Sequence, residues 1–339
     1  MAGLSVFAQG ERSEEVIKVE TALVGVPVAV SDRDGRYVPN LRVEDFTLYV
    51  DGKQQKIEFF AQSEEALNVA LLIDTSRSTH DVLGEIKDAA QDFIRLLKPQ
   101  DKAMIVSFDY EPHVLSALTD EREQLKRAVK KAEIGEYAGT ALNDAIDDTN
   151  RAFSKIKGRK AIIVLTDGKD AGSQQTADDL LYTLEESDAP VYTVFYKTGG
   201  SRFSGTRDGI MFPRGGRGGR GGMGRGGVFG GRFPNGGGRS GRNTERRRER
   251  VEQKNAEAED FLQQIAEETG GRSFSGEVGD LKKTFASIAD ELRFQYRLGF
   301  YPPENQTNET AEAAHALKVK VARTGAVVRT RSGYRVQNH

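Results

Sequence analysis

The segment LNVALLIDTSRST, from Leu67 to Thr79, combines a hydrophobic run with an abrupt polar ending. A continuous apolar run of this length is typical of a strand that is buried on both faces, as in a parallel sheet. The run ends in Asp74, and two hydroxyl residues, Ser76 and Ser78, follow at alternating positions. Because alternate residues of an extended loop point the same way, these three side chains are predicted to converge on one point.

Strands alternate with amphipathic helices on the C-terminal side of this segment. The runs KAMIVSFD (102–109), KAIIVLTD (160–167) and PVYTVFYK (190–197) are strand-like, and the segments between them carry apolar residues at helical spacing. This alternation predicts an α/β fold with a doubly wound, mostly parallel sheet. In such a sheet the carboxyl ends of the strands form the ligand-binding edge.

Antiparallel patterns flank the α/β region on both sides. Short strands joined by turns at RDGR and at Asp51-Gly52 precede it, and strand patterns return after residue 294. These two flanks are predicted to form one discontinuous β-sandwich-like domain into which the α/β domain is inserted. The predicted boundaries are 15–63 plus 294–339 for the β domain and 64–293 for the α/β domain.

Glycine and arginine dominate residues 198–250, as in PRGGRGGRGGMGRGG. Thirteen arginines face three acidic residues there, so this stretch carries a net charge of +10 and leaves −12 for the rest of a chain whose total is −2. Such a composition cannot bury enough apolar surface to offset its ordering entropy, which predicts a disordered insertion.

Two interpretations of this insertion are open, one with a binding function and one without. Its arginines, interleaved with Phe212, Phe229 and Phe233, favour electrostatic scaffolding, either on nucleic acid or another polyanion or on an acidic surface such as that of a neighbouring copy. The alternative is a flexible insertion without a partner, which is tolerated because a long loop adds little closure entropy.

Two further candidate side chains are predicted to lie at the ligand-binding edge of the sheet. One is an aspartate that closes the strand KAIIVLTD in a Thr-Asp-Gly turn, and the other is a threonine that follows Gly139 directly before a predicted helix. Oxygen ligands that mix hydroxyls and carboxylates suit a hard cation such as Mg²⁺. The candidate metal-site residues are Asp74, Ser76, Ser78, Thr140 and Asp167.

In this order and on these elements, the five residues resemble the metal-ion-dependent adhesion site of von Willebrand factor type A domains. The resemblance implies that the three hydroxyls contact the cation directly, whereas the two carboxylates act largely through water. It further implies that Mg²⁺, Mn²⁺ or Ca²⁺ occupies the site and accepts a carboxylate from a partner protein. The resemblance covers about residues 67–293, and the flanks extend it to a bacterial subgroup of such proteins, many of which are predicted to be exported.

Some features depart from the family pattern or have simpler interpretations. Ala138 stands where many family members have a second glycine, and Arg77 places a positively charged side chain in the loop between Ser76 and Ser78. Taken alone, Ser78 or Thr79 would be read as the cap of the following helix, and Asp167-Gly168 as an ordinary turn.

Asp109 and Asp170 also follow strands at the same edge. They are interpreted as solvated loop acids, with support of the metal ligands as the alternative.

Several enzyme classes lack their sequence signals in this chain. The absence of cysteine excludes thiol catalysis, structural disulfides and cysteine-ligated zinc. The GxxxxGK[ST] phosphate-binding loop is missing, and no Ser-His-Asp order can be assembled from the scattered histidines. His80 is the histidine near the proposed metal site and is interpreted as a surface residue. The chain is therefore predicted to be a binding protein and not an enzyme.

The N-terminal residues and the hydropathy of the chain indicate where in the cell the protein is located. No segment approaches the roughly 18 to 20 consecutive apolar residues of a membrane-spanning helix. Residues 1–14 are predicted to be a disordered N-terminus or the remnant of a signal peptide, because Val6-Phe7-Ala8 resembles the end of a secretory signal. Together with the family resemblance, this predicts an exported protein, either periplasmic, at the cell surface or secreted.

Overall fold

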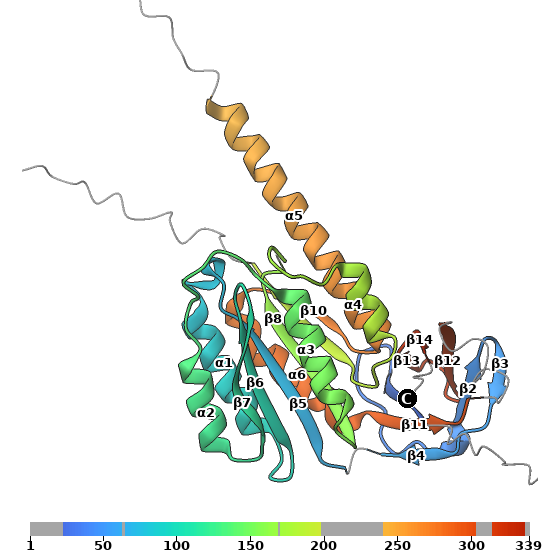
Figure 1. Ribbon diagram of the computed structural model, residues 1–339. Coiled ribbons are helices and arrows are strands. Elements are labelled where there is room, and N and C mark those ends of the chain that lie inside the picture. Colours follow the sequence, from blue (N-terminus) through green and yellow to red (C-terminus); the bar gives the residue numbers. More distant parts are fainter. Residues whose placement is uncertain (1–22, 63–64, 169, 198–239, 303–313, 336–339) are drawn as a thin grey trace, which may run out of the picture.

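The computed structural model describes residues 23–62, 65–168, 170–197, 240–302 and 314–335, and for residues 240–248 it describes the backbone alone. These residues form one six-stranded sheet and two four-stranded sheets (Figure 1). The predictions for residues 1–14 and for the arginine-glycine stretch up to residue 239 lie outside the described residues.

The six-stranded sheet is mostly parallel and has the order β10-β9-β8-β5-β6-β7. β7 runs antiparallel to β6, and the other pairings are parallel. The central strand β5 pairs with β6 on one side and β8 on the other, so its apolar run is buried on both faces as predicted. The strands are β5 (Leu67–Asp74), β6 (Lys102–Phe108), β7 (Pro112–Thr119), β8 (Arg159–Thr166), β9 (Val191–Tyr196) and β10 (Ser273–Gly276).

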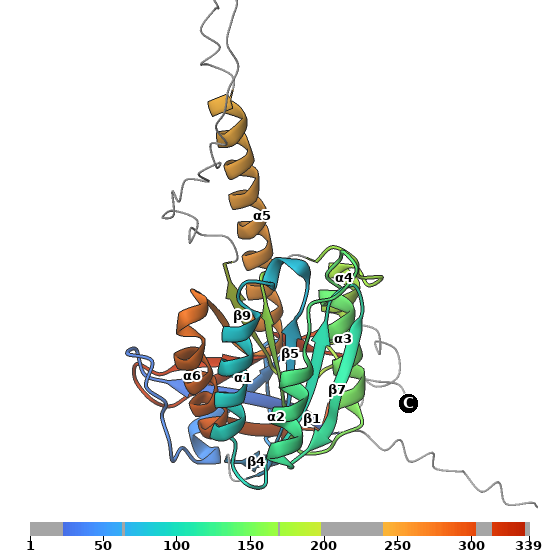
Figure 2. The ribbon, with the colours of Figure 1, turned by 90° about the vertical axis from the view of Figure 1, so that its left-hand side faces the viewer.

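Helices cover both faces of this sheet (Figure 2). α1, α2 and α6 enclose one apolar core, and α3, α4 and α5 enclose the other, because alternate residues of each strand face opposite layers. The helices are α1 (Leu83–Leu96), α2 (Arg122–Lys131), α3 (Leu142–Ser154), α4 (Ala177–Leu184), α5 (Ser240–Thr269) and α6 (Leu281–Phe294). In the described ranges, none of them combines the length and the apolar character needed to cross a bilayer.

Helix α5 begins at Ser240, which corrects the prediction that the chain is disordered as far as residue 250. The segment ERRRERVEQKN (245–255) contains residues with good helix propensity and neither glycine nor proline, so its high charge does not prevent helix formation. The first half of α5 projects away from the body (Figures 1 and 2), whereas Leu262 and Ile265 in its second half are buried in the core.

The strands before and after the α/β region pair with one another. β1 pairs with β11 and β13 in one antiparallel sheet, and β2 pairs with β12 in the other, so each sheet contains strands from both flanks of the chain. Both sheets contribute to one apolar core, and the turn between β2 and β3 is formed by Asp51 and Gly52, both with positive φ. The strands are β1 (Val24–Ser31), β2 (Phe46–Val50), β3 (Lys53–Gln55), β4 (Phe59–Ala61), β11 (Tyr296–Phe300), β12 (His315–Val321), β13 (Val327–Thr330) and β14 (Gly333–Tyr334). The predicted fold class, an α/β unit inserted between two parts of a β unit, is therefore confirmed.

Candidate metal centre

The carboxyl ends of β5 and β8 lie side by side and carry the two candidate carboxylates. The strands pair in parallel up to Ile73, and the Thr166 hydroxyl at the end of β8 donates a hydrogen bond of 2.7 Å to Asp74 Oδ2. Asp167 follows Thr166 directly. Asp74 and Asp167 are only 0% and 1% exposed, so two acidic side chains are buried at this edge of the sheet.

The burial of these carboxylates has an electrostatic consequence. Desolvation raises the pKa of Asp74 to about 6, and the negative charge of Asp167 adds to this shift. Hydrogen bonds from Ser76 and Thr166 oppose it. A bound cation would offset both the loss of hydration and the repulsion between the carboxylates, so the pair is a suitable environment for a metal ion.

The loop after β5 places two hydroxyls next to each other. The backbone N–H of Ser76 donates to Asp74 Oδ1 at 2.9 Å, and the Ser76 and Ser78 hydroxyl oxygens are 3.0 Å apart. Mg²⁺ binds its oxygen ligands at about 2.1 Å, which puts neighbouring corners of its octahedron about 3 Å apart. The spacing of the two hydroxyls therefore fits adjacent ligand positions on such an ion.

The hydroxyls of Ser78 and Thr79 do not cap helix α1, which follows this loop. A short 3-10 helix, η2 (Arg77–Thr79), comes first, and α1 then begins after Val82, whose side chain makes no cap hydrogen bond. The Thr79 hydroxyl instead donates to the carbonyl oxygens of Asp74 and Ser76 and closes the loop upon itself. The simpler interpretation of Ser78 or Thr79 as the cap of α1 is therefore wrong.

The loop that carries Thr140 is hydrogen-bonded to the loop after β5. The N–H of Gly135 donates to the carbonyl oxygen of Thr75 at 3.0 Å, and the guanidinium of Arg77 donates to the carbonyl oxygen of Glu136. Thr140 itself is 5% exposed. Arg77 thus helps to hold two of the candidate ligand loops together.

Asp170 connects the Thr140 loop to the loop after β8. Its Oδ1 accepts hydrogen bonds from the N–H groups of Leu142 (2.9 Å) and Asn143 (3.3 Å), which begin α3. The N–H of Ala171 also donates to the carbonyl oxygen of Thr140 at 2.9 Å. Asp170 is exposed, but it is more than a solvated loop acid, because it fixes the start of α3 next to Thr140.

The interpretation of Asp109 as a solvated acid is wrong. Asp109 is only 6% exposed, and its Oδ1 lies 3.2 Å from His113 Nε2 and accepts a bond from the Glu111 N–H at 3.3 Å. Its carbonyl oxygen accepts from the N–H of Ala141, directly after Thr140. Asp109 therefore also positions the Thr140 loop.

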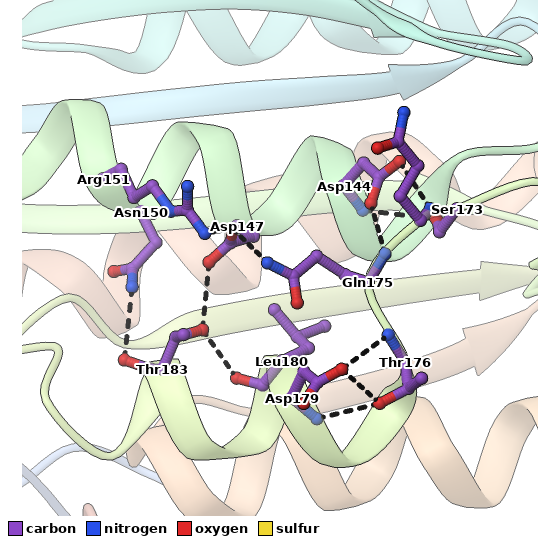
Figure 3. A network of polar contacts seen from close by, with 11 residues as sticks. Asp144, Asp147, Asn150, Arg151, Ser173, Gln175, Thr176, Asp179, Leu180 and Thr183 are labelled. Carbon is purple, nitrogen blue, oxygen red and sulfur yellow. Dashed lines mark hydrogen bonds and ion pairs between the residues drawn. The ribbon is translucent and has the colours of Figure 1, made fainter.

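Acidic residues of α3 hold the loop that follows Asp167, as Figure 3 shows. The two Asp144 carboxylate oxygens accept hydrogen bonds of 2.9 Å from the N–H groups of Gln174 and Gln175. Asp147 accepts from the Thr183 hydroxyl in α4 at 3.0 Å. These acids form a structural network that the sequence analysis did not identify.

The candidate centre contains fewer acidic groups than a typical carboxylate metal site. Across the described ranges, three or more His, Cys, Asp or Glu side chains do not come together where they could hold a metal ion. The proposed donor set has two carboxylates and three hydroxyls instead, so three of its five side chains, Ser76, Ser78 and Thr140, are neutral.

Sequence reasoning also missed the role of Thr166. Its hydroxyl donates to Asp74 and accepts a hydrogen bond of 2.9 Å from the Gly168 N–H, so it links both sides of the Asp167 turn. The available signal was the position of Thr166 inside the Thr-Asp-Gly turn, directly before a candidate ligand.

An exposed aromatic pair borders the candidate centre. Tyr110 and Tyr137 are 40% and 61% exposed, and their ring centroids lie 4.9 Å apart in an edge-to-face arrangement. Gly139, directly before Thr140, has a φ of +152°, and a Cβ there would lie 3.1 Å from Tyr110 Cβ. The pair therefore lies against the Thr140 loop and offers contact area to a molecule bound at this edge.

Comparison with known proteins finds one family model that matches part of the chain. Residues 69–169 match the family model of the von Willebrand factor type A domain, which confirms the predicted resemblance for this part of the chain. No curated protein matches the chain.

Several solved structures are similar in fold. One is an aerotolerance-related membrane protein from Bacteroides fragilis, at 18% identity and a TM-score of 0.45, covering 67% of this chain and 98% of that one. The conserved hypothetical protein BatB from Bacteroides thetaiotaomicron has 16% identity and a TM-score of 0.42 over the same shares. The vWF domain of the type V pili tip protein Mfa5 from Porphyromonas gingivalis has 22% identity and a TM-score of 0.28, covering 30% of this chain and 38% of that one.

Proposed function

We propose that the von Willebrand factor type A domain of this chain is a binding module that captures an acidic residue of a partner protein through a bound Mg²⁺ ion. The match to this family of interaction domains supports a protein-binding role. The observation that carries the metal-dependent part is the grouping of two buried carboxylates with paired hydroxyls 3.0 Å apart at one edge of the sheet.

Each residue of the centre has a role that follows from its contacts. Ser76, Ser78 and Thr140 would supply hydroxyl oxygens to the cation. Both oxygens of Asp74 already accept hydrogen bonds within the protein, so Asp74 mainly holds the first loop in place. With neutral hydroxyls as its nearest ligands, a bound Mg²⁺ would supply an electrophilic position for a carboxylate of the partner.

The metal site is tested by calorimetric titration of Mg²⁺ into protein that has been treated with chelator and dialysed. Ser78→Ala removes an exposed hydroxyl whose neighbour is Ser76, so the fold should survive while the Mg²⁺ affinity falls about tenfold or more. Ser154→Ala, at an exposed serine near the end of α3, is the matched control and should bind Mg²⁺ as the parent does. Equal Mg²⁺ affinity in the parent and Ser78→Ala would contradict the proposed site.

The partner chemistry needs a separate test. A display library of random peptides is bound to the protein in Mg²⁺ and eluted with chelator. The eluted peptides should share an Asp or Glu, and changing that residue to Asn or Gln should abolish binding. Mg²⁺ binding in the calorimeter without any such peptides would mean that the cation has a structural role and that the proposed partner chemistry is wrong.

The placement of the histidines supports a role other than catalysis. In the described ranges, His80 is exposed beside Asp81, His113 contacts Asp109 and His315 contacts Asp51. Each histidine thus contacts a carboxylate, and its hydrogen bonds do not lead to a serine that it could activate. Binding, and not catalysis, stays the proposed role of the chain.

The arginine-rich part of the chain supports a second candidate function. The first half of α5 continues the arginine-rich sequence and projects away from the folded body (Figure 1). An electrostatic scaffold that binds a polyanion through this part would lose affinity steeply as salt increases and would be insensitive to chelator. Metal-mediated binding would respond in the opposite way, so one binding assay with both treatments separates the two functions.

Export stays a prediction from the sequence and fits a partner-binding role outside the cytoplasm. It is tested by expressing the full-length gene in a bacterial host and assaying each cell fraction with an antibody. Recovery of the protein in the cytoplasmic fraction alone would contradict it.

A further inference from the structure

Tyr196, the last residue of β9, has a buried hydroxyl that the proposed function does not use. The side chain is 0% exposed, and within the part of the chain that the structure describes its hydroxyl has no hydrogen-bond partner. Leaving a buried polar group unpaired costs about 1 to 3 kcal/mol, so such a group calls for a specific explanation.

The strand register places Tyr196 next to the candidate metal centre. β8 and β9 pair in parallel, with Leu165 beside Val194 and Thr166 beside Phe195. The next position along both strands puts Asp167 beside Tyr196. Adjacent strands are about 4.8 Å apart, so the turn that carries Asp167 passes close to the end of β9. The Tyr196 side chain lies in the core on the side covered by α1 and α6.

The charges around the Tyr196 hydroxyl agree with this position. Burial raises the pKa of Tyr196 well above its usual range, and the negative charges of Asp74 and Asp167 raise it further. The phenol therefore keeps its proton at physiological pH and can only be useful there as a hydrogen-bond donor or as a weak acceptor. The anionic groups near it that could accept a hydrogen bond from this hydroxyl are the two carboxylates of the candidate centre, Asp74 and Asp167.

We propose that Tyr196 is a positioning residue of the metal centre, whose hydroxyl donates through one ordered water to the Asp167 carboxylate. This inference rests on the proposed metal site and extends it by one residue. The hydrogen bond would hold Asp167 in the orientation in which it faces the cation and its water ligands. Partners of this kind behind a metal site commonly change the metal affinity by about 10-fold to 100-fold when they are removed.

A matched pair of variants tests the inference. Tyr196→Phe removes the hydroxyl and keeps the ring, and Tyr192→Phe does the same four residues earlier, on the same face of β9. Tyr192 is also fully buried, but its hydroxyl donates to Glu291 at 3.1 Å, away from the metal centre. Calorimetric titration with Mg²⁺ should show an affinity at least tenfold weaker in Tyr196→Phe and an unchanged affinity in Tyr192→Phe.

A spectroscopic measurement separates positioning from a general effect on the fold. The chain has ten tyrosines and no tryptophan, so its near-ultraviolet absorption reports on tyrosine environments. Adding Mg²⁺ should produce a difference spectrum in the parent and in Tyr192→Phe that is smaller in Tyr196→Phe, because the contribution of Tyr196 is lost. Without metal, urea unfolding should show that Tyr196→Phe is at least as stable as the parent, because the variant no longer buries a hydroxyl without a direct protein partner, whereas Tyr192→Phe should be less stable because it loses the bond to Glu291.

The possible outcomes distinguish this inference from the proposed function. If the parent binds Mg²⁺ and Tyr196→Phe binds it equally well with the same difference spectrum, the role of Tyr196 is wrong and the proposed metal site stands. If the parent itself fails to bind Mg²⁺, both are wrong. If Tyr196→Phe is strongly destabilised without metal, its hydroxyl has a structural partner and the positioning role is overturned.

Discussion

At the scale of single residues, the candidate centre depends on Asp74, a buried carboxylate whose hydrogen bonds only partly offset the cost of burying its charge. Asp74 accepts one hydrogen bond from the Ser76 N–H and one from the Thr166 hydroxyl, yet burial and the charge of Asp167 still raise its pKa to about 6. The charged form of Asp74 is therefore unfavourable in the folded protein without a cation. A bound cation would favour the same charged form, so metal and proton compete for this site.

This competition predicts a specific pH dependence. The pKa of Asp74 is about 6 in the folded protein and about 3.9 in the unfolded chain, so only the folded state takes up the proton between these values. By linkage, the free energy of unfolding of metal-free protein should gain from Asp74 as the pH falls from 7 to 5. Excess Mg²⁺ should stabilise the folded protein less as the pH falls from 7 to 5, because protonation of Asp74 weakens metal binding.

The measurement is the melting temperature as a function of pH, with and without Mg²⁺. Asp74→Asn is the control, since it has no titrating group at this position and should lose both trends. A parent protein whose melting temperature follows that of Asp74→Asn at every pH would show that the pKa of Asp74 is not raised.

A second prediction concerns Thr166, whose hydroxyl both donates to Asp74 and accepts from the Gly168 N–H. Thr166→Val keeps the shape and leaves two buried partners unpaired, so it should lower the free energy of unfolding by about 1 to 3 kcal/mol and also weaken Mg²⁺ binding. Thr193→Val is the control, because Thr193 is equally buried but bonds only to the carbonyl oxygen of Leu262. Urea unfolding should register both changes, whereas Mg²⁺ titration should register Thr166→Val alone.

At the scale of elements, the junction after β8 is the point where packing constrains the centre most closely. Gly168 has a φ of +78°, and a Cβ there would lie 2.8 Å from Ala258 Cβ of α5 and 3.0 Å from the ring of Phe195 in β9. The turn that carries Asp167 therefore passes between a helix and a strand with no room for a side chain. Its geometry is set by both neighbours.

Gly168→Ala should consequently cost more than the backbone conformation alone explains. The positive φ costs about 1 to 2 kcal/mol for an alanine, and overpacking adds about 1 to 3 kcal/mol. Gly35→Ala is the matched control, since Gly35 has the same φ of +78° and nothing within 4 Å of its added Cβ. Equal losses of stability in the two variants, measured by urea unfolding, would contradict the role given to close packing.

The sequence predicted some elements well and others poorly, for physical reasons. The apolar run of β5 and the Asp74-x-Ser76-x-Ser78 pattern were informative because burial on both faces and a shared ligand point leave direct traces in the sequence. β7 was missed because it is an edge strand whose pairing with β6 is irregular, so its alternation is weak. The start of α5 was misjudged because charge and low complexity were taken as signs of disorder, although the residues from Glu245 onward favour a helix.

The parts of the centre that come from distant segments could not be predicted from local patterns. Asp170 was identified as a loop acid, but its bonds to the first N–H groups of α3 depend on how two loops meet in space. The same holds for Tyr196, whose relation to Asp167 follows from the register between β8 and β9. A single sequence lists the residues that form such contacts, but it does not show which of them meet in the folded protein.

At the scale of the whole molecule, a buried carboxylate joins the α/β unit to the β unit. Glu291 of α6 is 0% exposed and accepts hydrogen bonds from Tyr37 (2.9 Å) and from Tyr192 of β9 (3.1 Å). It also pairs with Arg329 of β13 at 2.6 Å. Because Tyr37 and Arg329 belong to the β unit, this single side chain connects both flanks of the chain to the last helix of the α/β unit.

This arrangement predicts that the two units unfold together and that Glu291 contributes strongly to their coupling. Glu291→Gln removes the charge that pairs with the half-buried Arg329 and weakens the hydrogen bonds to that charge, which should cost about 1.5 to 3 kcal/mol. Its neighbour Asp290 pairs with Arg293 at the surface, so Asp290→Asn should cost less than about 1 kcal/mol. Urea unfolding followed by tyrosine absorption and by circular dichroism should give one coincident transition in the parent and in Asp290→Asn. In Glu291→Gln the transition should move to lower urea and separate between the two probes, and an unchanged midpoint would show that the units are held together by their apolar contacts and not by this carboxylate.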